Sequence, residues 1–98
     1  MAQLRIRHTV QDYDAWRRTF DSDPLDRKGS GVLRYRVLRS TDLPNDVMID
    51  LEFATVAQAR VMLERLKELW TSPRSPALAG VDVVIVDTVD EADLATDS

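Results

Sequence analysis

The 98-residue sequence contains no cysteine and only one histidine, His8. The absence of cysteine excludes a disulfide framework, a CxxC redox pair, a thiolate zinc site and a cysteine nucleophile. A single histidine excludes a metal site built from two or three histidines of one chain. The sequence also lacks a phosphate-binding glycine loop, a GxSxG nucleophile elbow and a zinc-deaminase motif, so hydrolase and deaminase functions have no support.

Long hydrophobic runs are missing as well. No apolar stretch approaches 18 residues, so no transmembrane helix is expected. The first eight residues, MAQLRIRH, lack the apolar region of a signal peptide. We therefore expect a cytoplasmic protein that does not bind a membrane.

The net charge of −4 is unevenly distributed. Five of the 17 acidic residues lie between Asp87 and Ser98, where there is no basic residue, which leaves 12 acids against 13 bases in the rest of the chain. A near-neutral body does not predict a nucleic-acid partner. We expect one domain over residues 1–89, followed by an acidic and flexible tail over residues 90–98.

Four segments have the alternation or the β-branched composition of strands. They are residues 3–10, 32–39, 47–53 and 81–89. The short polar connection 40–46 predicts that the second and third strands form a hairpin. Residues 21–31 and 71–80 are predicted loops, the latter with a short helical turn near residues 76–78.

Two segments have helical signatures. Asp12 is a candidate N-cap for a helix that carries Tyr13, Trp16 and Phe20 on one face and ends before Pro24. The sequence TVAQ over residues 55–58 matches a capping box and predicts a helix that extends to about Trp70. The resulting order β-α-β-β-α-β predicts an α+β, ferredoxin-like domain with a four-stranded antiparallel sheet.

Two helices can cover only one face of such a sheet. That covered face should hold the apolar residues Leu4, Ile6, Leu33, Tyr35, Val37, Val47, Ile49, Leu51 and Phe53. The open face should show Arg5, Arg7, Arg34, Arg36, Met48, Asp50, Glu52, Val84 and Val86. If the third strand lies between the first and the second, its two acids lie between two pairs of arginines, where opposite charges stabilise a sheet.

This open face has two interpretations. It is either a solvated, salt-bridged surface or the interface of a homodimer in which two sheets face each other. The apolar Met48, Val84 and Val86 among the charges favour the homodimer. Two-fold symmetric dimers are also the commonest oligomers.

At this level of detail the chain resembles a known group of proteins. The segments that carry the likeness are HTVQDYDAWRRTFD (8–21), the loop 27–31 that leads into VLRYRVLRS, and the hairpin DLPNDVMIDLEFAT with the helix that follows it. They resemble the dimeric α+β barrel superfamily, and in particular its small bacterial members of the antibiotic biosynthesis monooxygenase-like or cyclase-like kind. The likeness covers about residues 3–89 and implies a ligand pocket between the helices and the sheet of each subunit.

The activities that the resemblance implies are varied. Members of the superfamily include cofactor-independent oxygenases of polyketide aromatics, cyclases, isomerases and haem-degrading monooxygenases. The haem-degrading members use a histidine shortly after the second helix as iron ligand. Residues 71–80 contain no histidine, so we expect no haem here, although His8 and Trp70 occupy comparable places. The chain also offers no metal or flavin motif, so we expect no other cofactor.

His8 is the candidate catalytic residue, because it alone titrates near neutral pH without a large shift. Its place in the strand pattern turns it toward the helices, where it is either a general acid or base or a structural histidine. Five aromatic residues are candidate walls of a substrate pocket, although a plain hydrophobic core would also use them. They are Tyr13, Trp16, Tyr35, Phe53 and Trp70.

Two functions follow from these residues. The first is a small monooxygenase- or cyclase-type enzyme that acts on an aromatic or polyketide-like molecule, with neither metal nor flavin. The second is a non-catalytic dimeric module that binds a ligand or a partner. A cavity of several hundred cubic ångströms beside His8 favours the enzyme, and a filled core favours the module.

Overall fold

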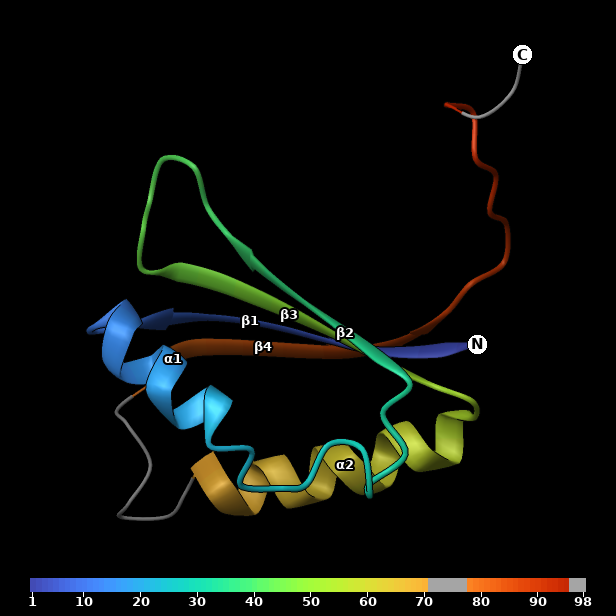
Figure 1. The fold of residues 1–98 in the computed structure, drawn as a ribbon, viewed down its shortest axis with the longest axis horizontal. Coiled ribbons are helices and arrows are strands. Elements are labelled where there is room, and N and C mark those ends of the chain that lie inside the picture. Colours follow the sequence, from blue (N-terminus) through green and yellow to red (C-terminus); the bar gives the residue numbers. More distant parts are fainter. Residues whose placement is uncertain (71–77, 96–98) are drawn as a thin grey trace.

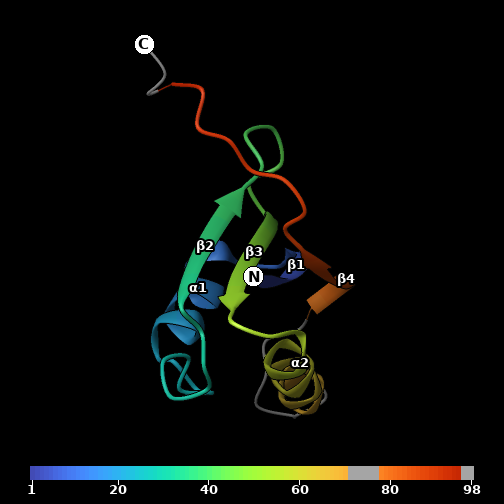
Figure 2. The same ribbon diagram turned by 90° about the vertical axis from the view of Figure 1, so that its right-hand side faces the viewer.

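The computed structural model describes residues 1–70 and 78–95. Its elements are β1 (Ala2–Val10), α1 (Tyr13–Asp21), β2 (Arg34–Arg39), β3 (Asp46–Phe53), α2 (Val56–Trp70) and β4 (Leu78–Asp87). The strands form one antiparallel sheet in the order β2-β3-β1-β4. Both helices lie on the same side of this sheet (Figures 1 and 2). The predicted ferredoxin-like α+β fold is therefore confirmed, with the third strand between the first and the second.

The two helices begin where the sequence predicts, because their first amides find side-chain acceptors. The backbone amides of Asp14 and Ala15 donate to Oδ1 of Asp12, at 3.0 and 3.3 Å. At α2 the amide of Gln58 donates to Oγ1 of Thr55 at 3.2 Å, and the amide of Thr55 donates to Oε1 of Gln58 at 3.3 Å. These reciprocal bonds are the predicted capping box.

The hydrophobic core lies between the covered face of the sheet and the helices. Along β1, buried and exposed residues alternate as the sequence pattern predicts. Leu4, Val47, Phe53 and Ala59 are completely inaccessible to solvent, and Met62 of α2 is 2% exposed. Helix α2 packs beneath β1, β3 and β4, so the edge strand β2 receives the least cover.

The second strand is shorter than predicted. It begins at Arg34, and Val32 and Leu33 precede it. Leu33 was expected on the helix-covered face, but its side chain is 58% exposed because no helix lies beneath this end of the edge strand. The chain reaches β2 from Gly31, whose positive φ of 95° suits a residue without a side chain.

The fourth strand is shifted toward the N-terminus relative to the prediction. Residues 78–80 were predicted as loop but begin β4, because Leu78 and Ala79 extend the ladder opposite Val10 and Thr9. A helical turn at residues 76–78 therefore does not include Leu78, and the rest of the predicted loop, 71–77, lies outside the described residues. At the other end, Val89 was predicted as strand but follows β4 and is 95% exposed.

The open face of the sheet carries the predicted charge ladder. Arg5 and Asp50 pair at 3.3 Å and Arg34 and Glu52 at 3.5 Å, each across neighbouring strands. Exposed apolar side chains lie among these charges, and they are Leu38, Met48 and Val84.

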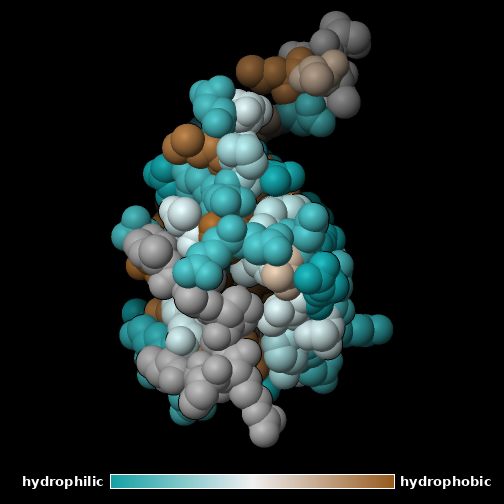
Figure 3. Space-filling model, turned by 90° about the vertical axis from the view of Figure 1, so that its left-hand side faces the viewer, coloured by the Kyte–Doolittle hydropathy of each residue, from teal (hydrophilic) through white to brown (hydrophobic). Residues whose placement is uncertain are grey.

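Exposed hydrophobic side chains also lie outside the open face, and they include Leu43, Val61 and Leu94. Seen from the end where α1 begins, most of the described side chains are hydrophilic, with a few hydrophobic ones among them (Figure 3). Residues 90–95 are exposed. Among the described residues, no helix is long and apolar enough to cross a membrane.

Candidate functional site

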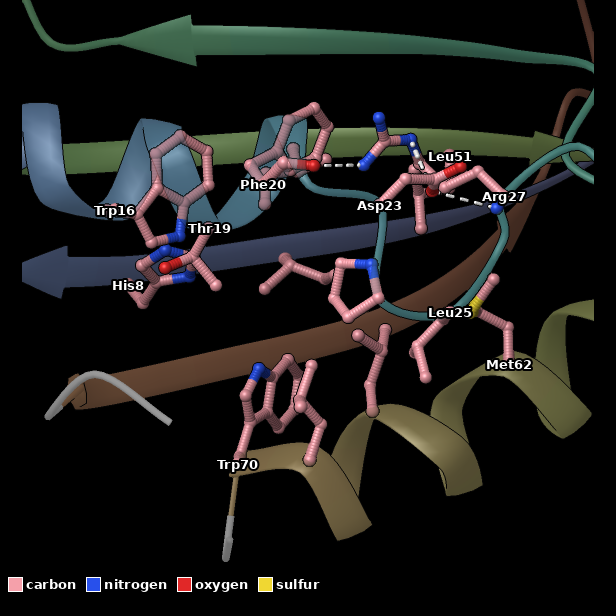
Figure 4. Close-up of a pocket in the computed structure, with 15 residues that line it drawn as sticks. His8, Trp16, Thr19, Phe20, Asp23, Leu25, Arg27, Leu51, Met62 and Trp70 are labelled. Atoms are coloured by element: carbon pink, nitrogen blue, oxygen red, sulfur yellow. Dashed lines mark hydrogen bonds and ion pairs between the residues drawn. The ribbon is translucent and has the colours of Figure 1, made fainter. Parts of the chain in front are cut away.

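A cavity of about 90 Å³ lies between the sheet and the two helices, next to His8. Its walls come from β1, β3, α1, α2 and the segment that joins α1 to β2. His8, Trp16 and Thr19 lie at one end, Trp70 lies across from them, and Arg27 lies at the other end (Figure 4). The lining is mostly apolar, so polar groups that reach it are candidates for ligand recognition.

His8 is the most unusual polar residue of this cavity. It lies on β1 with its side chain toward the helices, and it is only 2% exposed. Neither ring nitrogen has a hydrogen-bond partner among the described residues. The ladder between β1 and β4 also shifts register between Arg7 and Thr9, so an irregularity of the sheet lies at this histidine.

Burial sets the protonation state of this imidazole. It lowers the pKa of His8 below the ordinary 6.5, and the negative charge of Asp46 opposes that shift with a smaller effect. At neutral pH the ring is therefore neutral, with one nitrogen lone pair free to accept a proton.

A second, more polar hollow lies on the other side of His8. Its residues are Arg7, His8, Thr9, Leu43, Pro44, Asn45 and Asp46. Here Nε and Nη2 of Arg7 donate to the two carboxylate oxygens of Asp46, at 3.2 and 2.8 Å. This bidentate contact holds the pKa of Asp46 below its usual range, so the carboxylate stays charged beside the histidine.

Aromatic rings continue from His8 along the inner face of α1. The centroids of His8 and Trp16 are 5.5 Å apart, those of Trp16 and Phe20 are 5.3 Å apart, and Phe20 meets Tyr35 edge-on at 5.2 Å. The guanidinium of Arg27 covers the Phe20 ring at 4.0 Å. Of these rings, His8, Trp16 and Phe20 line the cavity, and only Trp16 and Phe20 are near-parallel, with 26° between their planes. The Arg27 guanidinium at the other end pairs with Asp23 at 3.4 Å.

The structure brings only some of the predicted site residues together. His8, Trp16 and Trp70 line the cavity. The other three predicted residues, Tyr13, Tyr35 and Phe53, do not line it. Tyr13 packs against Trp16, and the Arg39 guanidinium lies 4.0 Å from the Tyr13 ring. Tyr35 lies beyond Phe20, and Phe53 is fully buried in the core.

Sequence reasoning missed Thr19, Leu25 and Arg27 as lining residues. Thr19 lies three residues after Trp16, and this helical spacing is a signal that could have found it. Leu25 and Arg27 lie in an irregular segment where Asp23 and Asp26 have positive φ values of 55° and 49°, and no periodicity predicts their direction.

Comparisons with known proteins identify the class of fold. Neither a protein-family model nor a curated protein sequence matches the chain. Solved structures do match it over nearly their whole length. One is described as a candidate antibiotic biosynthesis monooxygenase from Deinococcus radiodurans, with a TM-score of 0.68, 9% identity, and coverage of 96% of this chain and 98% of that one.

Two further structures agree with this result. A dimeric ferredoxin-like protein from an uncultured marine organism has a TM-score of 0.66 and 14% identity, and the match covers 93% of this chain and 96% of that one. A variant of MhuD with two manganese protoporphyrin IX molecules per active site has a TM-score of 0.68 and 10% identity, with 93% and 98% covered. The chain thus has the same ferredoxin-like fold as these solved structures.

A porphyrin does not fit the cavity of this chain. Its volume of about 90 Å³ is below the roughly 300 Å³ at which sites for drug-sized ligands begin. The only histidine of the chain, His8, is buried in the sheet with its ring against Trp16. Among residues 1–70 and 78–95, no group of three or more His, Cys, Asp or Glu side chains could hold a metal ion.

Proposed function

We propose that this protein is a small monooxygenase- or cyclase-type enzyme that binds a flat aromatic molecule between its sheet and helices. The observation that carries the proposal is the neutral, buried imidazole of His8, whose nitrogens have no partner among the described residues and which lies at the cavity beside Trp16. A buried polar group without a partner is costly, and a ligand with an acidic hydrogen satisfies it.

The chemistry assigned to His8 is general-base catalysis. It takes the proton from an activated CH₂ group of the substrate, and the resulting carbanion gives electrons to molecular oxygen. The balanced reaction is R₂CH₂ + O₂ → R₂C=O + H₂O: one oxygen atom enters the product, the other leaves as water, and His8 returns its proton to that water. The apolar walls keep solvent from the anion, and Trp16 offers a ring face for stacking.

The alternative is a non-catalytic binding module, and the size of the cavity favours it. A space of about 90 Å³ accepts a substituted ring only if wall side chains move. In that case His8 donates to or accepts from a small ligand, and no reaction follows.

We further propose that the protein acts as a homodimer through the open face of its sheet. Leu38, Met48 and Val84 are exposed there among charged residues, a composition suited to an interface. A protein of similar fold that is itself dimeric supports this assembly.

Anthrone, a flat aromatic ketone with an acidic CH₂, tests both the chemistry assigned to His8 and the movement of wall side chains that a cavity of about 90 Å³ requires. The wild-type protein is expected to accelerate oxygen uptake with anthrone, and His8→Phe is expected to lose this acceleration while remaining folded. Thr9→Val, which changes the neighbouring residue on the opposite side of β1, is the matched control and should keep it. Quenching of the tryptophan fluorescence, which comes from Trp16 and Trp70 at the cavity, without oxygen uptake indicates the binding module instead. If anthrone causes neither oxygen uptake nor quenching, both proposed functions are overturned.

A further inference from the structure

The four strands carry charges of alternating sign on the open face of the sheet. Residues that are paired directly across neighbouring strands point to the same face of the sheet, so the strand register shows which charged residues lie on the open face. In the order β2, β3, β1, β4 they are Arg34 and Arg36, Asp50 and Glu52, Arg5 and Arg7, and Asp82. The face is therefore positive, negative, positive and negative from one edge to the other.

Most of these charges are neutralised within the chain. Arg5 contacts Asp50, Arg34 contacts Glu52, and Arg7 is held by Asp46, which precedes the two acids on β3. Two exposed charges are left without a close ion pair among the described residues, namely Arg36 on β2 and Asp82 on β4.

Arg36 and Asp82 have opposite signs but cannot satisfy each other in one subunit. Asp82 exerts only a longer-range attraction on Arg7, whose guanidinium is already committed to Asp46. Because β2 and β4 are the two edges of the sheet, three strand spacings of about 4.8 Å separate them, or roughly 14 Å. Both residues, together with Met48 and Val84, border a hollow of about 460 Å³ in the open face.

Two copies of this face can meet with their strands aligned in two ways that obey two-fold symmetry. If the axis runs across the strands, each strand lies over its own copy, and every charge row meets a row of the same sign. If the axis runs along the strands, the order is reversed: β2 lies over the partner's β4, and β3 lies over the partner's β1. Every row then meets the opposite sign, so the alternation of charge selects the second arrangement.

We propose that two copies of this chain pair in the second arrangement and that Arg36 of each subunit forms an ion pair with the partner's Asp82. A two-fold axis along the strands leaves each residue at its own height along the strand direction. The ladder places Arg36 at the same height as Val84, so Arg36 lies over the partner's Val84. The partner's Asp82 is two residues further along the same strand. That step is about 7 Å along the strand, within reach of an arginine side chain. The inference rests on the proposed homodimer and adds its strand register and its two specific contacts.

Charge reversal tests the register directly. Arg36→Glu alone places two Glu–Asp repulsions in its homodimer, and Asp82→Arg alone places two Arg–Arg repulsions in its own. Each variant is expected to dimerise at least about tenfold more weakly than wild type in sedimentation velocity. Mixed in equal amounts, they are expected to form a heterodimer of near wild-type affinity, because both contacts then join opposite charges.

The matched controls carry the same charge changes on α1, on the other side of the sheet. Arg18→Glu and Asp14→Arg should dimerise like wild type, and their mixture should show only the statistical share of heterodimer. If a charge-reversed variant does not fold by circular dichroism, the milder Arg36→Gln and Asp82→Asn replace it, and their double variant should be no weaker than either single one.

The outcomes separate this inference from the proposals on which it rests. A monomeric wild type overturns the homodimer and the register with it. A dimeric wild type whose Arg36 and Asp82 variants dimerise normally, or whose mixture forms no preferred heterodimer, overturns the register and leaves the homodimer in place. Oxygen uptake with anthrone tests the proposed enzymatic activity independently of the homodimer and its register.

Discussion

Replacing His8 with phenylalanine should remove a pH dependence from the free energy of unfolding. Burial lowers the pKa of His8 in the folded protein, so below the ordinary pKa of 6.5 the unfolded chain binds more protons than the folded one. Stability is therefore complete above pH 6.5 and falls as the pH decreases through and below that value. One group changes the free energy of unfolding by at most about 1.4 kcal/mol per pH unit, and here it does so only below pH 6.5, where the unfolded imidazole is protonated. Only the unit from pH 6.5 to 5.5 therefore counts, and the loss between pH 7.5 and 5.5 is at most about 1.4 kcal/mol.

The assay is urea denaturation of the wild type and His8→Phe at pH 7.5, 6.5 and 5.5, at one fixed protein concentration because a dimer gains stability by mass action. Carboxylates ordinarily titrate near pH 4, so they contribute little in this window. The free energy of unfolding of His8→Phe should stay constant over the pH range in which that of the wild type decreases. The variant should also be no less stable at pH 7.5, because an apolar ring replaces two nitrogens that lack partners.

Nuclear magnetic resonance gives an independent measurement, because the chain has a single histidine and its ring signals need no assignment. The titration midpoint should lie below 6.5. Parallel stability profiles for the two proteins, or a midpoint at or above 6.5, would refute the buried neutral imidazole and remove the support for His8 as a base.

Three further predictions concern the surroundings of the site and the core. Asp46→Asn should lower the pKa of His8 further, since the Asp46 charge is the one that raises it, and the same resonance titration measures this shift. Leu4→Ala, at a completely buried position of β1, should lower the free energy of unfolding by about 2–5 kcal/mol in urea denaturation, and a loss under 1 kcal/mol would contradict the core described here. Thr55→Ala removes the oxygen that accepts from the Gln58 amide and should cost about 1 kcal/mol, whereas Thr55→Ser should restore most of it.

The order of elements and the faces of the strands could be predicted from the sequence because both depend on local periodicity. Alternation along residues 3–10 placed Leu4 and His8 toward the helices and Arg5 and Arg7 on the open face, and the structure agrees. The caps at Asp12 and Thr55 were equally local, because each side chain bonds an amide within three residues of itself.

Pairing between distant segments decided what the sequence pattern did not. The early start of β4 at Leu78 depends on a free ladder position opposite Val10, and the exposure of Leu33 depends on where α2 ends its cover of the sheet. Neither the start of β4 nor the exposure of Leu33 can be predicted from the composition of the sequence or the spacing of its residues.

The sequence by itself determined that a histidine and several aromatic rings would face the helices, since side-chain direction follows from the period of each element. Only the tertiary structure decided that His8 meets Trp16 and Trp70 at one cavity while Tyr35 and Phe53 lie away from it. It also decided that Arg36 and Asp82 end at opposite edges of the sheet, because strand order depends on how the two halves of the chain pack together.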